Sequence, residues 1–264
     1  MMDLSAVTPA GFLQAGELDV SRFTGAGVRV AVVDSGVDNT HPAIGGRIRG
    51  GAVVDRFEDY VVVGEYDSRD LFGHGTAVAS IVLDVAPGAE VHSVRVLGTN
   101  LASRSEIILQ GLRWAIDQGF HVINCSFGTC NLAYMSEYKE VVDLAYCRDV
   151  VVTAACNNND FAVRELPSAF PAVVAVDYLR GQVDDPLTLY RRRGQLVEYV
   201  ARGANLQLPW LNHKVTTTSG SSFATPHVTG IVCRLLERYP GLRPFEVKTL
   251  LHHLADPLPE PRGP

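Results

Sequence analysis

No stretch of this sequence approaches the ~20 consecutive apolar residues that cross a bilayer. The first thirty residues also lack the positively charged start and the apolar run of an export signal. Basic residues (23) do not exceed acidic ones (29), so the charge balance gives no sign of a surface for nucleic acid or anionic lipid. We therefore expect no membrane and no nucleic-acid partner, and the sequence leaves the oligomeric state open.

Cysteine is also scarce, and its five positions show no pairing pattern. An odd number without paired ligand spacing argues against a disulfide framework and against a zinc site. Free thiols in a reducing, cytoplasmic compartment are expected. A secreted enzyme is the alternative if the chain is a mature form trimmed of its export signal. The cysteines are Cys125, Cys130, Cys147, Cys156 and Cys233.

Internal repeats and low-complexity linkers are missing as well, which predicts one domain over residues 1–264. We expect an N-terminal arm over 1–14 and a disordered Pro-rich tail over 257–264. Short β-branched runs predict strands over residues 28–33, 90–97, 122–125, 150–154 and 173–176. Helices are predicted over residues 74–83, 105–118, 136–147, 222–239 and 244–254. This alternation is typical of an α/β fold in three layers, a mostly parallel β-sheet flanked by helices.

Three polar motifs stand out from this framework. Asp34 ends a predicted strand in the segment VAVVDSGVD, residues 30–38. His74 begins a predicted helix in GHGTAVAS, residues 73–80, and Ser222 follows a short turn in GSSFATPHV, residues 220–228. Active sites of parallel sheets gather at the carboxyl ends of the strands, where Asp34 is expected to lie.

The chemistry of these three residue types is complementary. A serine hydroxyl becomes an effective nucleophile when an imidazole takes its proton. A buried carboxylate holds that imidazole in one tautomer. A serine at a helix N-terminus also has backbone N–H dipoles directed at a developing oxyanion. We therefore interpret Asp34, His74 and Ser222 as a candidate catalytic triad.

The three segments resemble the D-S/T-G, H-G-T and G-T-S-M-A-T-P motifs of the subtilase family, in the family's chain order. The resemblance covers about residues 15–256 and implies a subtilisin-like serine protease. The segment VVVTAACN, residues 150–157, is similar to the family's V-V-A-A-A-G-N, whose Asn completes the oxyanion hole. It implies that role for Asn157, although Asn158 and Asn159 follow directly and a shift of one residue stays open.

Further matches imply where a peptide or protein substrate would bind in extended form. The segment INCSFG, residues 123–128, resembles the family's I-N-M-S-L-G, which lines the primary specificity pocket. The segment VRVLG, residues 94–98, resembles V-K-V-L-G, and the loop after it would pair with the substrate as an added strand. The substrate-binding candidates are Asn100, Leu101, Ala102, Ser103, Ser126, Phe127, Gly128, Ala154, Ala155, Cys156 and Glu165.

The sequence also departs from the family. Ala77 replaces a second His, which is not catalytic. The inserted calcium loop of secreted subtilisins is missing after Leu83, and Ala43 stands where an acidic ligand follows the His-Pro pair. Too few oxygen ligands then remain for a tight calcium site, so we expect that site to be absent. No metal and no other cofactor is expected.

Two departures concern the specificity pocket. Cys156 replaces a Gly, and Glu165 stands where the family often has Gly at the pocket base. A carboxylate there would favour Arg or Lys before the scissile bond. A solvated Glu165 is an equal alternative, and the idea fails if Phe127 and Cys156 block a long basic side chain. The specificity therefore stays open.

The resemblance implies a serine endopeptidase that works through an acyl-enzyme. A cytosolic processing protease would fit the missing calcium loop, and whether a prodomain lies outside this chain stays open. One alternative is a peptide ligase or cyclase on the same fold, but such members usually carry an added lid, and no insertion is large enough. Another is an inactive binding protein, but such proteins usually lose triad members, and all three are present.

Overall fold

The computed structural model describes residues 18–160, 162–192 and 197–259. The expected arm over residues 1–14 lies outside the described residues, and only 257–259 of the expected Pro-rich tail are described. No helix in these described ranges is both long enough and apolar enough to cross a membrane.

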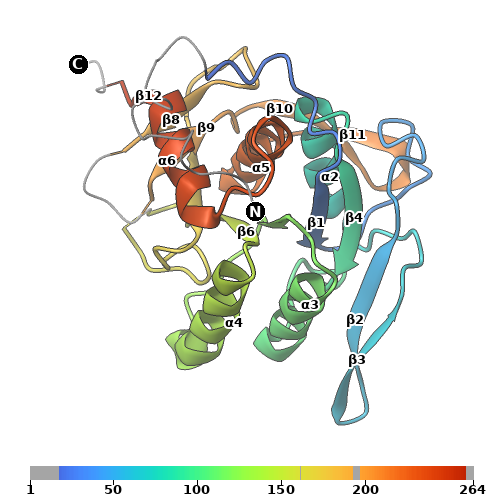
Figure 1. Ribbon diagram of the computed structural model, residues 1–264. Helices are drawn as coiled ribbons and strands as arrows, with labels where there is room; N and C mark the ends of the chain where they lie inside the picture. Colours follow the sequence, from blue (N-terminus) through green and yellow to red (C-terminus); the bar gives the residue numbers. More distant parts are fainter. Residues whose placement is uncertain (1–17, 161, 193–196, 260–264) are drawn as a thin grey trace.

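A ten-stranded sheet forms the centre of the molecule, in the order β12-β8-β9-β7-β6-β5-β1-β4-β2-β3 (Figure 1). Only the β2–β3 and β8–β9 pairs are antiparallel, so the sheet is mostly parallel as predicted. The strands are β1 (Arg29–Asp34), β2 (Gly51–Phe57), β3 (Tyr60–Glu65), β4 (Glu90–Arg95), β5 (Val122–Cys125), β6 (Val151–Ala155), β7 (Val174–Tyr178), β8 (Leu189–Arg191), β9 (Tyr199–Ala201) and β12 (Asp256–Pro257). A separate two-stranded sheet pairs β10 (Leu206–Trp210) with β11 (Lys214–Thr218).

Helices cover both faces of the central sheet (Figure 1). They are α2 (His74–Val85), α3 (Ser105–Asp117), α4 (Met135–Cys147), α5 (Ser221–Arg238) and α6 (Pro244–Leu254), with short 3-10 turns at Leu132–Tyr134 and Leu211–His213. One apolar core lies between the sheet and α2, α5 and α6, and the other lies between the sheet and α3 and α4. The predicted three-layer α/β fold is therefore confirmed.

Strand β1 shows why the sequence builds two cores. Side chains of a strand point alternately to opposite faces of the sheet. Val30 and Val32 accordingly pack into the α2–α5–α6 core, and Ala31 and Val33 into the α3–α4 core. A strand buried on both faces must be apolar throughout, which explains the unbroken run before Asp34. After Arg29 at the start of β1, the next polar side chain is Asp34, at the carboxyl end of the strand.

Candidate active site

Asp34 and His74 meet between the end of β1 and the start of α2. The Nδ1 atom of His74 lies 2.9 Å and 3.0 Å from the two carboxylate oxygens of Asp34. Both side chains are buried, with 4% of His74 and 0% of Asp34 exposed. The backbone N–H of Ser35 donates to Asp34 at 2.7 Å and fixes the carboxylate. The structure thus joins two of the three predicted triad residues.

Gly75 permits this close approach. A Cβ atom at Gly75 would lie 2.0 Å from the carbonyl oxygen of Gly36, far inside van der Waals contact. The first turn of α2 therefore packs directly on the backbone that follows β1. Any larger residue at position 75 would push His74 away from Asp34.

The environment of His74 sets its basicity. Burial disfavours the charged imidazolium, but the charge and hydrogen bond of Asp34, with a further contribution from Asp70, outweigh burial and raise the pKa of His74. An imidazole held in this way by a carboxylate at Nδ1 presents Nε2 as its proton acceptor. The pair can therefore serve as a general base.

Ser222 lies in the first turn of α5, directly before Phe223. The ring of the next residue, Phe223, packs on His74 with 5.1 Å between ring centroids. Pro226 has no N–H, so the helix leaves the carbonyl of Ser222 without its usual partner, and the hydroxyl of Ser126 donates to that carbonyl at 2.8 Å. Among the described residues no hydrogen bond joins His74 to Ser222, a bond that often forms only when substrate is bound.

The turn after β6 carries the predicted oxyanion donor. The side-chain oxygen of Asn157 accepts hydrogen bonds from the N–H groups of Asn159 at 2.9 Å and Asp160 at 3.1 Å. This fixes the side chain, while its NH₂ group has only a weak contact, at 4.0 Å, with the sulfur of Cys130. Asn157 therefore keeps a donor available for an oxyanion.

Asn158 has a role that sequence reasoning missed. Its side-chain oxygen accepts from the N–H of Ser221 at 2.8 Å and from the hydroxyl of Ser221 at 3.0 Å. The same hydroxyl lies 2.7 Å from the carbonyl of Cys156, to which it can also donate. These contacts tie the turn after β6 to the residue before the proposed nucleophile. The run of three asparagines was the only signal in the sequence, and it did not show which one does what.

Asp70 is a second residue that the sequence did not reveal. Its carboxylate accepts from the N–H groups of Phe72 and Gly73 and from the hydroxyl of Ser35, at 2.8–2.9 Å. It also accepts from the N–H and the hydroxyl of Thr76, at 2.8 Å and 2.6 Å. Asp70 thus caps the start of α2 and connects it to β1. An acidic residue just before a helix is a recognisable capping signal, which could have identified it.

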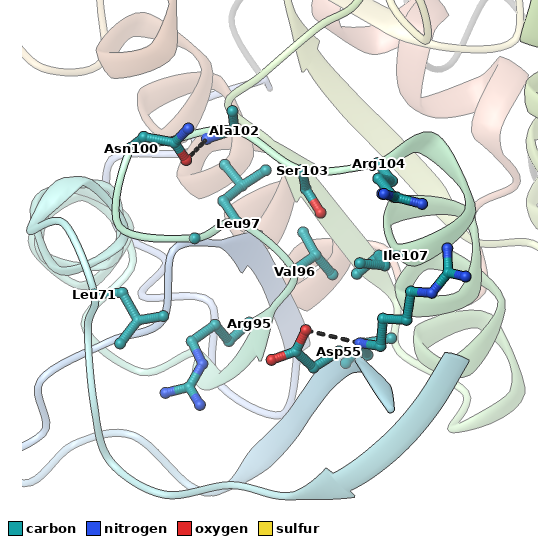
Figure 2. Close-up of a pocket in the computed structure, with 13 residues that line it drawn as sticks. Asp55, Leu71, Arg95, Val96, Leu97, Asn100, Ala102, Ser103, Arg104 and Ile107 are labelled. Atoms are coloured by element: carbon teal, nitrogen blue, oxygen red, sulfur yellow. Dashed lines mark hydrogen bonds between the residues drawn. The ribbon is translucent and has the colours of Figure 1, made fainter. Parts of the chain in front are cut away.

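The predicted substrate loop follows β4. Within it, Leu101 N–H donates to the carbonyl of Gly98, and Gly98 N–H donates to the carbonyl of Ala102, both at 3.0 Å. The side chain of Asn100 accepts from Ala102 N–H at 3.3 Å. The loop Asn100–Ser103 borders a cavity of about 460 Å³, which Figure 2 shows between this loop, β2, β4 and the start of α3. Three arginines line that cavity: Arg56, Arg95 and Arg104.

The predicted specificity-pocket residues come together at the ends of β5 and β6. These strands are parallel neighbours, with Cys125 opposite Ala154, so residues 126–128 leave β5 next to the end of β6, where Ala155 and Cys156 follow. Ala154 is fully buried in the α3–α4 core, Ala155 and Cys156 are almost fully buried, and Phe127 is half-buried against that core. The segment carrying Glu165 runs antiparallel to this wall, because Thr129 and Leu166 exchange backbone hydrogen bonds at 3.0 Å and 2.8 Å.

Glu165 lies directly on Gly128. A Cβ atom at Gly128 would be 2.3 Å from Cγ of Glu165 and 2.5 Å from its Cδ. Burial raises the pKa of Glu165. In the described part of the chain, no hydrogen bond or ion pair involves its carboxylate. The side chain is therefore a half-buried, unpaired carboxylate against Gly128.

All five cysteines are free; Cys125, Cys156 and Cys233 are buried, and Cys130 and Cys147 are exposed. Burial raises the pKa of each buried thiol, which keeps it protonated. Within the described residues, no group of three or more His, Cys, Asp or Glu side chains could hold a metal ion. The absence of a calcium site remains a prediction.

Comparisons with known proteins give matches to one family. A family model described as "Subtilase family" matches residues 25–263. The M-protease of Shouchella clausii (strain KSM-K16) is 33% identical over 244 residues, which are 88% of this chain and 60% of that protein's length. Subtilisin Savinase of Lederbergia lenta is 33% identical over 247 residues, 89% of this chain and 86% of that protein.

Solved structures of two proteases are also similar to this chain. A psychrophilic protease named S41 superposes with a TM-score of 0.74 at 27% identity, covering 86% of this chain and 82% of that chain. A cold-adapted subtilisin-like serine proteinase superposes with a TM-score of 0.69 at the same identity and coverage.

Proposed function

Because this chain belongs to the subtilase family of serine proteases, we propose that it is an endopeptidase whose nucleophile is Ser222. The observation that carries the proposal is the buried contact of 2.9 Å between Nδ1 of His74 and the Asp34 carboxylate. This contact orients a base beside the helix turn that holds Ser222. Asn157, with a fixed side chain and a free NH₂ group, supplies the oxyanion donor.

The reaction proceeds in two acyl-transfer steps. The Oγ atom of Ser222 attacks the scissile carbonyl carbon while its proton moves to Nε2 of His74, and Asp34 stabilises the imidazolium. Asn157 and the backbone N–H of Ser222 bind the oxyanion. The C–N bond then breaks as His74 protonates the leaving amine. Water attacks the acyl-enzyme and gives a proton to His74. The ester C–O bond then breaks as His74 returns that proton to Oγ of Ser222, which releases the acid and restores the enzyme.

A fluorophosphonate probe tests this directly. We expect the wild-type chain to be labelled covalently and the Ser222→Ala variant to remain unlabelled. The matched control is Ser221→Ala, which removes the neighbouring hydroxyl and should leave labelling detectable. Labelling of the Ser222→Ala variant would contradict the assignment of the nucleophile, and so would a wild-type chain that is not labelled. Mass spectrometry of peptide products separates hydrolysis from ligation.

We further propose that the primary pocket selects Arg or Lys before the scissile bond. Support comes from the unpaired, half-buried carboxylate of Glu165 against Gly128, because such a group gains most from an opposite charge. Replacing it by the isosteric amide in Glu165→Gln should lower kcat/KM for Arg substrates about 10-fold or more and leave Leu substrates almost unchanged. Faster wild-type cleavage after Phe or Leu than after Arg would contradict this specificity.

We propose a cytosolic processing role for this enzyme. The five free cysteines support a reducing compartment. The proposed selection of a basic residue by Glu165 supports cleavage at few sites. Cleavage-site profiling on a denatured proteome, with Ser222→Ala as the blank, should show few sites with a shared basic residue. Immunodetection in cell fractions should place the protein with soluble cytosolic markers, and its recovery outside the cell would contradict the location.

A further inference from the structure

A buried carboxylate lies next to the turn after β6 that carries Asn157 and Asn158 (the oxyanion turn). Asp177, near the end of β7, has a side chain that is 0% exposed and accepts from the N–H of Tyr178 at 2.8 Å. Two guanidinium groups bind its other oxygen, Arg192 at 2.8 Å and Arg180 at 3.2 Å. A buried carboxylate requires such partners, because an unpaired charge away from water strongly destabilises the folded state. The roles described above for the triad and for Asn157 do not include this cluster.

The cluster adjoins the start of the oxyanion turn. Strands β6 and β7 are parallel neighbours, with Ala155 opposite Val176. The N–H of Cys156 donates to the carbonyl of Val176 at 3.0 Å. Asp177 therefore lies beside Cys156, where the chain leaves β6 and enters the turn that carries Asn157 and Asn158. Burial, with the charge of Asp177 adding to it, raises the pKa of the Cys156 thiol.

Arg180 extends this cluster to the turn itself. Its Nη1 atom binds Asp177, while its Nη2 atom donates to the carbonyl of Asn158 at 3.0 Å. The guanidinium also stacks on the ring of Tyr178, 4.6 Å from the centroid, which restricts its motion. The side chain of Asn158 in turn holds the N–H and hydroxyl of Ser221. A continuous path of contacts thus runs from Asp177 to the residue before the proposed nucleophile.

We infer that Arg180, anchored on Asp177, is a positioning residue that sets the oxyanion turn against the helix of the nucleophile. The inference rests on the proposed function. An oxyanion donor stabilises the transition state only when it is held close to hydrogen-bond distance, and small displacements are costly. Asn157 is bound by its own turn, to Asn159 and Asp160. The position of the Asn157 side chain therefore depends on the position of the turn, and Arg180 holds the turn from the side of β7 through the carbonyl of Asn158.

The test compares Arg180→Met with Arg192→Met, which removes the other guanidinium from the same carboxylate. The Arg180 side chain is 48% exposed, so its loss should not unfold the protein, whereas Arg192 is 13% exposed and its loss should mainly lower stability. For Arg180→Met we expect kcat to fall about 5- to 50-fold, less than the ~10²–10³ known for losing an oxyanion donor in a subtilisin. KM for an uncharged peptide should change less than about twofold, because the ground state makes no use of the oxyanion hole.

A peptide aldehyde gives a second readout, because its adduct with serine carries an oxyanion. Its affinity should fall by the same factor as kcat in Arg180→Met and stay near the wild-type value in Arg192→Met. Unchanged kcat and aldehyde affinity in Arg180→Met, or equal losses in both variants, would overturn the positioning role. Wild-type protein that neither turns over peptide nor labels with fluorophosphonate would instead overturn the proposed function, and this inference with it.

Discussion

Asp70→Asn tests how α2 is held against β1. The substitution keeps the shape of the side chain but replaces one acceptor oxygen by an NH₂ donor. In the wild type, Oδ1 accepts three hydrogen bonds and Oδ2 accepts the two from Thr76. The amide oxygen of the variant should take the place of Oδ1 and keep its three hydrogen bonds. The NH₂ group would then take the place of Oδ2 and face Thr76.

The loss of stability depends on which hydrogen bonds Thr76 can still form. Its N–H would then meet another donor, and its hydroxyl already accepts from the N–H of Asp38 at 3.0 Å. Thr76 is almost fully buried, with 1% exposed, so water cannot replace the lost acceptor. Hydrogen bonds to a charged group contribute about 1.5–3 kcal/mol each. Two of them are lost and partial relaxation is expected, so the free energy of unfolding should fall by about 2–4 kcal/mol.

The substitution also removes a negative charge that helps to raise the pKa of His74. The acidic limb of kcat/KM should therefore move to lower pH. Urea unfolding measures the first effect, and a pH series with a chromogenic peptide measures the second. The matched control is Asp67→Asn, which breaks the ion pair with Arg95 but should cost only about 0–1 kcal/mol because Asp67 is solvent-accessible. Equal stability losses in the two variants would refute the reasoning.

Three further predictions concern the catalytic groups. Asp34→Asn should lower kcat about 10⁴-fold, because an amide stabilises the wrong tautomer of His74, and this is the loss seen for the same change in another serine protease. A single-turnover rate within about tenfold of the wild-type rate would contradict this prediction. Asn157→Ala should lower kcat about 10²–10³-fold, as in a subtilisin, with KM almost unchanged, whereas a pure KM effect would assign the oxyanion role elsewhere. Since the pKa of His74 is raised, kcat/KM should rise with pH through a value above ~6.5. The pair's contribution to stability should be complete below ~6.5 and be lost above the raised pKa, so urea unfolding of wild type and Asp34→Asn should converge at high pH.

Local pattern was enough to predict most of the fold. The central strands are buried on both faces, so their unbroken apolar runs can be read from the sequence, and β1, β5, β6 and β7 lie within a residue or two of their predicted positions. The strands toward the two ends of the sheet were not predicted. Strand β3 exposes most of its side chains, and β8, β9 and β12 have only two or three residues each, so pairing with a neighbour decides that they form.

The triad candidates could likewise be named from sequence, because Asp34, His74 and Ser222 each lie in a distinctive local segment. How distant polar groups meet, in contrast, depends on the folded arrangement of the whole chain. Asp70 with Thr76 and Ser35, Asn158 with Ser221, and Asp177 with Arg180 and Arg192 carry no shared periodicity along the chain. Hydrophobic patterning is a local property of a sequence, whereas the partner of a buried hydrogen-bonding group depends on which strand ends and turns the closed sheet brings together.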